Sequence, residues 1–304
     1  MEAERRFRAM GTDVHVVVHG QPDLLDMAQS EIERLEGLWS RFRPGSEITR
    51  LNDRAGSWVA VSRETAELVD RALQGWRATS GHFDPTVLGD VVRAGYDCSF
   101  EGLVDRHDAP VSHLRRGAGG IAVDRAEPAV RVPVGSGFDP GGLGKGLAAD
   151  LVADRLDAEG AAGVLVNVGG DLRAIGHGPR GDDWTVEIDP AATGLPLATV
   201  ALDQGALATS TVLRRRWRID GRPKHHLIDP LTGDPADRGI VAASVLAAHG
   251  WQAEVLAKAA IVAGLDAALE LIDQVGAAAV LVDEVGTLHR STGFDRFVVE
   301  RVPS

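Results

Sequence analysis

The sequence is poor in several features that would each point to a particular class of protein. It has one cysteine, Cys98, which excludes an intrachain disulfide and a metal site built from several cysteines. No uninterrupted apolar run reaches the roughly 20 residues that a membrane-spanning helix needs. Acidic residues outnumber basic ones by 44 to 32. A general affinity for nucleic acid is therefore not expected, because it requires clustered Lys and Arg.

The first ten residues also lack the features of a leader. They carry several charged side chains and no apolar segment of the kind found in secretory signals. A single cysteine fits a reducing compartment. We therefore expect a cytoplasmic protein without a membrane span. With 304 residues, 44% of them hydrophobic, the chain can bury a substantial core.

Hydrophobic periodicity predicts both helices and strands along the chain. Apolar spacings of three and four predict helices over residues 24–42, 63–81, 143–156, 251–263 and 266–275. Short alternating or continuous apolar runs predict strands over residues 14–18, 121–123, 130–134, 164–168, 172–175, 185–188, 198–202, 217–219, 241–246, 279–282, 287–289 and 297–299. Too few helices separate these strands for a doubly wound parallel sheet. We expect an α+β fold with a mostly antiparallel sheet and packed helices. Residues 1–304 are expected to form one domain, with a variable polar insertion at about 97–119.

A glycine-rich segment precedes one of the predicted helices. Four glycines surround Lys145 in the sequence Gly-Gly-Leu-Gly-Lys-Gly over residues 141–146. Such a turn lets backbone N–H groups approach an anion while the helix dipole favours negative charge. The spacing matches neither a Walker A motif nor a dinucleotide fingerprint. On its own, the segment is equally consistent with a tight turn that allows close helix packing.

This segment belongs to an ordered series of seven motifs. They are Met10-Gly11-Thr12, Ser46 to Asn52, Gly81 to Thr86, Asp139 to Asp150, Val166 to Asp171, Ala208-Thr209-Ser210, and His226 to Gly233. Together, over about residues 9–265, they resemble the ApbE family of FAD:protein FMN transferases. The resemblance implies an α+β architecture related to the T-fold. It also implies FAD as donor substrate, transfer of FMN to a Thr or Ser hydroxyl of an acceptor flavoprotein, and release of AMP. FAD hydrolysis to FMN and AMP, and FAD binding without catalysis, remain alternatives.

The resemblance and side-chain chemistry together assign roles to single residues. His226 is expected to be the catalytic base, since imidazole titrates near neutrality, with Asp229 or a backbone carbonyl to orient it. His225 is expected to point to the opposite face if the segment is a strand. The residues expected to bind the cofactor are Met10, Asn52, Asp84, Thr86, Gly141, Gly142, Lys145, Asp171, Thr209 and Ser210.

Several of these assignments compete with a structural role. The Asn52 amide is expected to form hydrogen bonds with the flavin edge; the alternative is a plain surface turn capped by Ser46. Asp171 is expected to accept a hydrogen bond from an adenosine or ribose hydroxyl; the alternative is that it caps a β-turn. A purely structural turn competes at Asp84 and Thr86. Core packing competes with flavin contact at Met10. Thr209 and Ser210 are expected to donate to a phosphate.

The sequence departs from the family at residues 254 and 258. Where the family typically has an Asp and a Thr that bind Mg²⁺, this chain has Glu254 and Lys258. A protonated lysine cannot ligate a cation and repels one. Three interpretations stay open. The two side chains form an exposed ion pair; or Mg²⁺ is still held by Glu254 and backbone oxygens, including Gly142; or Lys258, as a catalytic residue, neutralises the FAD diphosphate in place of the metal.

Overall fold

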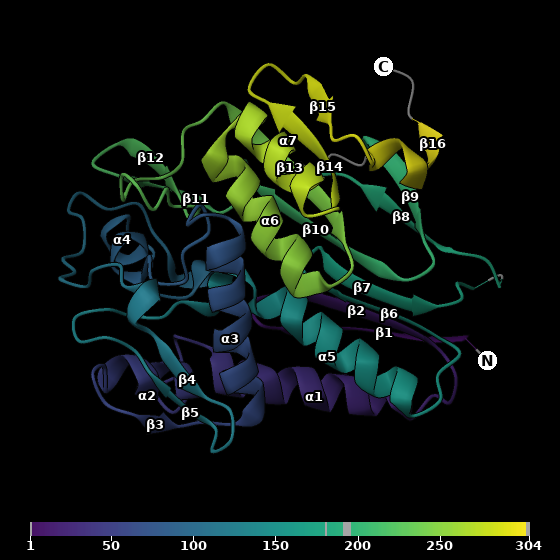
Figure 1. Cartoon of the computed structure of the whole chain (residues 1–304), viewed down its shortest axis with the longest axis horizontal. Helices are drawn as coiled ribbons and strands as arrows, with labels where there is room; N and C mark the ends of the chain where they lie inside the picture. The colour runs from purple at the N-terminus through teal and green to yellow at the C-terminus, as the bar shows by residue number, and fades with distance from the viewer. Residues whose placement is uncertain (1, 180, 191–195, 302–304) are drawn as a thin grey trace.

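The computed structural model describes residues 2–179, 181–190 and 196–301 (Figure 1). Its strands are β1 (Glu2–Ala9), β2 (Thr12–His19), β3 (Val59–Ala60), β4 (Ala122–Asp124), β5 (Ala129–Arg131), β6 (Gly163–Val168), β7 (Asp171–Gly176), β8 (Trp184–Ile188), β9 (Ala198–Leu202), β10 (Gly205–Thr211), β11 (Arg216–Ile219), β12 (Arg222–His225), β13 (Ile240–Ala247), β14 (Ala278–Asp283), β15 (Leu288–Arg290) and β16 (Val298–Arg301). Its α-helices are α1 (Leu24–Trp39), α2 (Glu47–Asp53), α3 (Arg63–Ala78), α4 (Leu88–Arg93), α5 (Gly144–Ala158), α6 (Gly250–Ala263) and α7 (Leu265–Gln274). A short 3₁₀ helix, η3 (Pro140–Gly142), precedes α5.

One large sheet organises the molecule. Its eight strands lie in the order β1-β2-β6-β7-β10-β13-β14-β15, and every neighbouring pair is antiparallel. Helices α1, α5, α6 and α7 pack on one face (Figure 1). A smaller antiparallel sheet, β16-β9-β8, shares a buried apolar cluster with the opposite face. The predicted α+β class with a mostly antiparallel sheet is confirmed.

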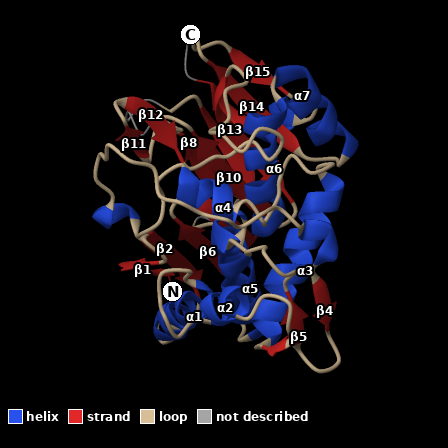
Figure 2. Ribbon diagram, turned by 90° about the vertical axis from the view of Figure 1, so that its left-hand side faces the viewer, coloured by secondary structure: helices blue, strands red, loops and turns tan. Residues whose placement is uncertain are grey.

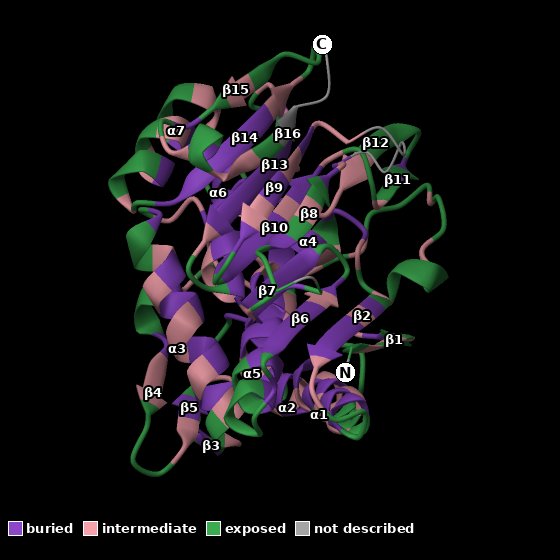
Figure 3. Ribbon diagram, turned by 90° about the vertical axis from the view of Figure 1, so that its right-hand side faces the viewer, coloured by how far each residue is buried: buried purple, intermediate pink, exposed green. Residues whose placement is uncertain are grey.

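Burial follows from this layering. Strands β6, β7, β13 and β14 are buried along most of their length because both faces are covered (Figure 3). Their sequences are accordingly mostly apolar, although β7 also contains the buried Asp171 and Arg173. Helix α6 is also buried on nearly all sides. Among the described residues, no helix combines the length and the apolar character that crossing a membrane requires.

The first hairpin of the large sheet shows how local sequence sets the geometry. Ala9 pairs with Thr12, so the turn consists of Met10 and Gly11 alone. Both turn residues have positive φ, 52° and 65°, as a two-residue type I′ connection requires. The sequence analysis did not predict β1. Its burial alternates between exposed and half-buried residues, as expected for a charged edge strand.

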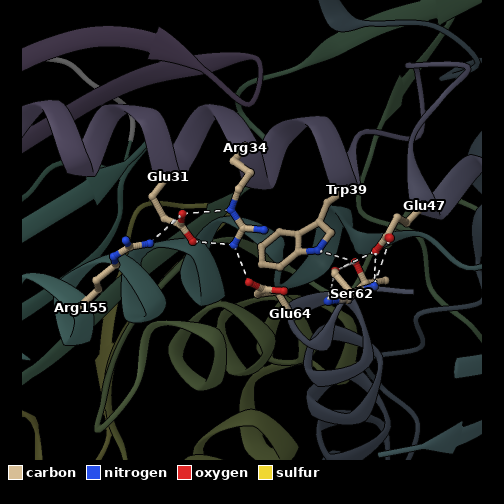
Figure 4. A network of polar contacts seen from close by, with 8 residues as sticks. Glu31, Arg34, Trp39, Glu47, Ser62, Glu64 and Arg155 are labelled. Atoms are coloured by element: carbon tan, nitrogen blue, oxygen red, sulfur yellow. Dashed lines mark hydrogen bonds and ion pairs between the residues drawn. The ribbon is translucent and has the colours of Figure 1, made fainter. Parts of the chain in front are cut away.

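Polar contacts fix the helices beneath the sheet to one another (Figure 4). Arg34 of α1 bonds Glu31 at 2.7 Å and Glu64 of α3 at 2.5 Å, and Glu31 also receives Arg155 of α5 at 3.2 Å. Ser62 caps α3 by accepting from the Thr65 N–H. These contacts hold the end of α1 in place.

The region around residues 97–119 is irregular, as expected from its composition. It contains two 3₁₀ turns, Phe100–Gly102 and Ala118–Gly120, and an isolated β-bridge from Arg106 to Ile219. Helix α4 and the β11–β12 hairpin, neither of them fully predicted, lie beside it (Figures 1 and 2). Trp217 of β11 donates to the Ala94 carbonyl at 2.6 Å, which ties the hairpin to α4.

Candidate functional site

A pocket of about 500 Å³ lies where the first turn of α5, the end of α1 and the segment after β12 meet. Seven of the residues that the sequence assigned to the site line it: Met10, Asp84, Gly141, Gly142, Lys145, His226 and Lys258. Segments more than 200 residues apart in the chain therefore converge on one cavity. A concave site with a few converging polar groups is the usual form of a small-molecule site.

The glycine-rich turn forms one wall of this pocket. Asp139 accepts a hydrogen bond of 2.9 Å from the Gly141 N–H, which closes the short 3₁₀ turn before α5. A Cβ at Gly142 would overlap the ring of Phe83, and one at Gly146 would overlap the backbone of Gly250. Glycine is thus required for packing, and the N-terminal end of α5 is also presented to the cavity. The close-packing interpretation of the segment is confirmed, and anion binding at this turn stays a prediction.

Four charged side chains meet at the floor of the pocket. Lys145 of α5 bonds both Asp171 and Glu254, the latter at 2.9 Å. Lys258, one turn further along α6, donates to the same Oε1 atom of Glu254 at 2.9 Å. The Gly146 N–H donates to Oε2 of Glu254 at 2.8 Å. Two ammonium groups and two carboxylates therefore form one connected cluster.

Burial makes this cluster electrostatically strong. Glu254 is fully buried and Asp171 is 2% exposed. Burial alone would raise the pKa of Glu254, but Lys145 and Lys258 lower it to about 2. Burial likewise opposes the charge of Lys145, yet Asp171 and Glu254 raise its pKa. Burial and the charge of Glu254 raise the pKa of Asp171, and the charge of Lys145 opposes that shift. The exposed ion pair considered for Glu254 and Lys258 is wrong, because Glu254 is inaccessible.

His226 directly follows β12 and lines the cavity, as the glycine-rich turn does. Burial lowers its pKa well below the usual value, and the charges of Arg215 and Lys258 lower it further. Its Nδ1 atom is buried and lacks a hydrogen-bond partner among the described residues. The ring is therefore neutral and has a free position for a ligand or a proton. His225 instead contacts the Ala236 carbonyl at 3.1 Å.

Asp229 does not orient His226, which corrects one expectation. Its carboxylate accepts from the Arg238 guanidinium at 2.8 Å and from the Leu231 N–H at 2.8 Å. It is 2% exposed and stabilises the loop after His226. An Asx turn of this kind is a local structural motif. The Asp229-Pro230 sequence thus shapes the loop.

Five of the predicted cofactor residues do not line the pocket, and four of these, Asn52, Thr86, Thr209 and Ser210, make contacts within the fold. Asn52 donates to the Phe138 carbonyl at 3.0 Å and accepts from the Phe138 N–H at 2.7 Å, so both ends of its amide hold the loop before Asp139. Thr86 is buried and donates to Asp84. Thr209 of β10 bonds Ser244 of β13 at 2.8 Å, and its neighbour Ser210 is buried in the same strand. The structure gives these residues supporting positions.

Asp171 is also displaced from its expected role. It begins β7, directly after the turn at Gly169 and Gly170, but its carboxylate is buried against Lys145. An adenosine hydroxyl cannot reach a side chain that lies behind another residue. Asp171 instead belongs to the floor of the pocket through its ion pair. Among the metal residues considered, Gly142 lines the cavity while Glu254 lies beneath it.

The sequence analysis missed an aromatic and cationic wall at the mouth of the pocket. The Arg41 guanidinium lies 4.1 Å from the ring centre of Phe42 and 4.8 Å from that of Tyr96. Phe42 is 38% exposed, and Phe100 and Arg215 complete this wall. Such side chains stack readily on flat aromatic ligands. The motif Arg41-Phe42-Arg43 was the available signal, but it was assigned only to the end of a helix.

The residues around Glu254 do not fit a divalent cation. Mg²⁺ takes six oxygen ligands in near-octahedral geometry at about 2.0–2.1 Å. Both oxygens of Glu254 already accept N–H groups, and the nearest additional groups are two ammoniums. Within the described ranges, no group of three or more His, Cys, Asp or Glu side chains is placed to hold a metal.

Comparison with known proteins identifies the family of this chain. The ApbE family model matches residues 10–282. The chain is 30% identical to an FAD:protein FMN transferase of Treponema pallidum (strain Nichols), with 89% of this chain and 82% of that protein covered. The chain is 32% identical to an FAD:protein FMN transferase of Rhodobacter capsulatus, with 92% of this chain and 55% of that protein covered. The chain superposes on the crystal structure of the ApbE protein of Thermotoga maritima with a TM-score of 0.88. The two are 29% identical, and 99% of this chain and 100% of that chain are covered. The chain belongs to the ApbE family.

Proposed function

We propose that this protein is an FAD:protein FMN transferase. It binds FAD in the pocket, transfers FMN to a Thr or Ser hydroxyl of an acceptor flavoprotein, and releases AMP. The observation that carries the proposal is the convergence of His226 and the turn at 141–146 on one cavity of about 500 Å³. The relatives named above supply the reaction. We propose that residues 1–304 act as one domain in the cytoplasm, as the composition indicates.

The chemistry requires a base, stabilisation of charge and rigid positioning. The acceptor hydroxyl oxygen forms a bond to the phosphorus that carries riboflavin, and the bond from that phosphorus to the bridging oxygen breaks. AMP leaves with the bridging oxygen, and the hydroxyl proton passes to His226. A low pKa keeps this imidazole neutral and ready to accept the proton. The products are AMP and a protein carrying FMN through a phosphate ester.

The pocket offers distinct regions for the parts of FAD. The N-terminal end of α5, with Gly141 and Gly142, is suited to the diphosphate because helix N-termini favour anions. The wall formed by Arg41, Phe42 and Tyr96 is suited to a flat ring system. Met10 and Asp84 complete the lining. We propose no step through Mg²⁺, because the residues around Glu254 do not fit it.

One experiment separates this function from its alternatives. The protein is incubated with FAD and candidate acceptor flavoproteins, and intact proteins are analysed by mass spectrometry while AMP is quantified. An acceptor that gains the mass of FMN minus water, with an equal amount of AMP, supports transfer. AMP and free FMN without modified protein indicate hydrolysis. Bound, intact FAD without turnover indicates a binding protein.

Two neighbouring histidines provide a matched pair for the assignment of the base. His226→Ala is expected to abolish AMP release while FAD still binds. His225→Gln, which alters a structural contact next to the site, is expected to retain most activity. Unchanged AMP release in the His226 variant would remove this residue from the reaction.

A further inference from the structure

The floor of the pocket suggests how the diphosphate is neutralised. We infer that the ammonium groups of Lys258 and Lys145, held by Glu254, are the cation that binds the FAD diphosphate, so that the reaction needs no divalent metal ion. The inference rests on the proposed function, since it names the counter-charge at the same site. It assigns Lys258 as the residue that replaces the metal.

Hydrogen-bonding geometry supplies the first argument. Lys145 and Lys258 come from different helices, α5 and α6, and meet at one oxygen of Glu254, each at 2.9 Å. An ammonium group has three N–H donors. The bonds described use two donors of Lys145, to Asp171 and Glu254, and one of Lys258. Three donors remain for a ligand, and both lysines line the pocket.

The charges and the burial of the four side chains also support a role for the lysines in binding the diphosphate. The carboxylates lie beneath the pocket, with Glu254 fully buried and Asp171 2% exposed, whereas the side chains of Lys145 and Lys258 are 19% and 15% exposed. The negative charges are therefore covered by the positive ones as seen from the cavity. A diphosphate that reaches this floor meets the two ammonium groups, while the carboxylates of Glu36, Asp84, Glu101 and Asp139 line other parts of the cavity. Charge-assisted hydrogen bonds to phosphate are among the stronger polar contacts in proteins.

The small number of lysines in the chain is a further reason to assign them this role. Of the 32 basic residues, only three are lysines, Lys145, Lys224 and Lys258, and the rest are arginines. Two of these three meet at Glu254. Arginine presents a wide planar fork, whereas lysine presents a compact point charge that can stand where a metal ion would. In a chain that otherwise uses arginine, lysine at both positions indicates a requirement for that compact charge.

A purely structural role for Lys258 makes a different prediction. If Lys258 only balances the charge of Glu254, its removal lowers stability and leaves the affinity of the folded protein for FAD nearly unchanged. If it binds the diphosphate, affinity falls in the folded protein. The affinity for FAD in the presence of a chelator separates these roles, because it reports on the counter-charge before any chemistry.

The test measures FAD binding by isothermal titration calorimetry, with EDTA and then with Mg²⁺, in three proteins. These are the wild type, Lys258→Met, which keeps the length of the side chain and removes its charge, and the control Lys224→Met. Lys224 is on β12 and does not line the pocket. Melting curves establish that each variant is folded. AMP release is followed under the same buffer conditions with an acceptor flavoprotein added.

We expect the wild type to bind FAD in EDTA with an affinity within twofold of that in Mg²⁺, and to release AMP in both. Lys258→Met is expected to bind at least tenfold more weakly, and Lys224→Met to match the wild type. Wild-type binding or AMP release that rises tenfold or more on adding Mg²⁺ would overturn the inference, as would wild-type affinity in a folded Lys258→Met protein. A wild type that binds no FAD in either condition would overturn the proposed function itself. If Lys258→Met does not fold, the inference is decided by the affinity of the wild type for FAD in EDTA compared with its affinity in Mg²⁺.

Discussion

The backbone N–H of Gly146 donates a hydrogen bond of 2.8 Å to Oε2 of Glu254. This contact joins the first turn of α5 to α6, across 108 residues of sequence. It places a fully buried carboxylate directly beneath the glycine-rich turn. The end of α5 that we propose to bind the diphosphate and the lysine-bearing face of α6 are thereby joined, so changes at either residue should affect both stability and FAD binding.

Replacing Glu254 with Gln should destabilise the protein strongly. The change leaves Lys145 and Lys258 with only Asp171 as a counter-charge in a buried setting. Removing one partner of a buried ion pair typically costs about 3–5 kcal/mol. Urea unfolding measures the change in free energy. Glu67→Gln, which removes an exposed pair with Arg71, is the control and should cost under about 1 kcal/mol. Equal losses in the two variants would contradict the buried cluster.

Replacing Gly146 with Ala tests the close approach of α5 and α6. The added methyl group would overlap the backbone of Gly250, so the helices must separate. Overpacking of this kind costs about 1–3 kcal/mol, and here it should also weaken FAD binding. Gly37→Ala in the interior of α1 is a matched control, because its methyl group meets only the tip of Arg43 at 4.0 Å. That variant should be as stable as the wild type or slightly more stable. A Gly146→Ala protein with unchanged stability would show that the two helices are not in such close contact.

The acid limb of the pH–rate profile should respond to Arg215. Burial is the main cause of the low pKa of His226, and the charge of Arg215 is the next. A base with a lowered pKa stays neutral to lower pH, so kcat/KM should fall only well below pH 6.5. Arg215→Met removes a positive charge and should move that limb to higher pH. A limb that does not move, measured over pH 4–8 with AMP release, would argue that His226 is not the titrating base.

The aromatic wall should contribute to FAD affinity. Phe42 is 38% exposed at the pocket, next to Arg41 and Tyr96. Aromatic stacking contributes about 0.5–1.5 kcal/mol beyond area burial, so Phe42→Ala should weaken FAD binding by roughly three- to tenfold. Trp58 is 50% exposed but does not line the pocket, and Trp58→Ala should leave affinity unchanged. Quenching of flavin fluorescence provides the measurement. Equal affinities in the two variants would place FAD away from this wall.

Regular periodicity made most of the fold predictable. The α1, α3, α6 and α7 helices and the buried strands β6, β7 and β13 lie close to their predicted ranges. Strand β1 was missed because its residues are charged and its apolar alternation is weak. Strand β10 was missed because Gly, Ala, Thr and Ser dominate it, and its burial comes from neighbours on both sides. Tertiary context, which a local pattern does not contain, decides such segments.

The site was only partly predictable for a similar reason. Motif order located His226, Lys145 and the glycine-rich turn, because each lies at the end or start of a regular element. It did not give the direction of the Asn52 amide, which bonds Phe138, 86 residues away. Nor did it reveal that Lys145 meets Glu254, 109 residues away. Contacts at such separations depend on how helices pack, and the local sequence around each partner carries no sign of them.

Asp150 should give the protein an unusual dependence of stability on pH. It lies on α5 and is 4% exposed. It accepts from the N–H groups of Gly250 and Trp251, at 2.7 and 3.0 Å, at the start of α6. Burial raises its pKa from 3.8 to about 6 despite these bonds. Between those two values the folded state binds more protons than the unfolded state, so this group lowers stability as pH rises through that window.

The test compares the wild type with Asp150→Asn, which does not titrate. From pH 4 to pH 7 the free energy of unfolding of the wild type should fall by about 2 kcal/mol relative to the variant, since a shift of one pKa unit corresponds to about 1.4 kcal/mol and pH 4 already lies just above the unfolded pKa. Asp283 provides a control of opposite sign. Its bond to His289 lowers its pKa, so its contribution is present above the unfolded pKa and is lost as pH falls. Relative to Asp283→Asn, the wild type should gain stability as pH rises. Urea unfolding at several pH values measures both, and the same slope for Asp150→Asn and wild type would contradict a buried carboxyl with a raised pKa at the α5–α6 junction.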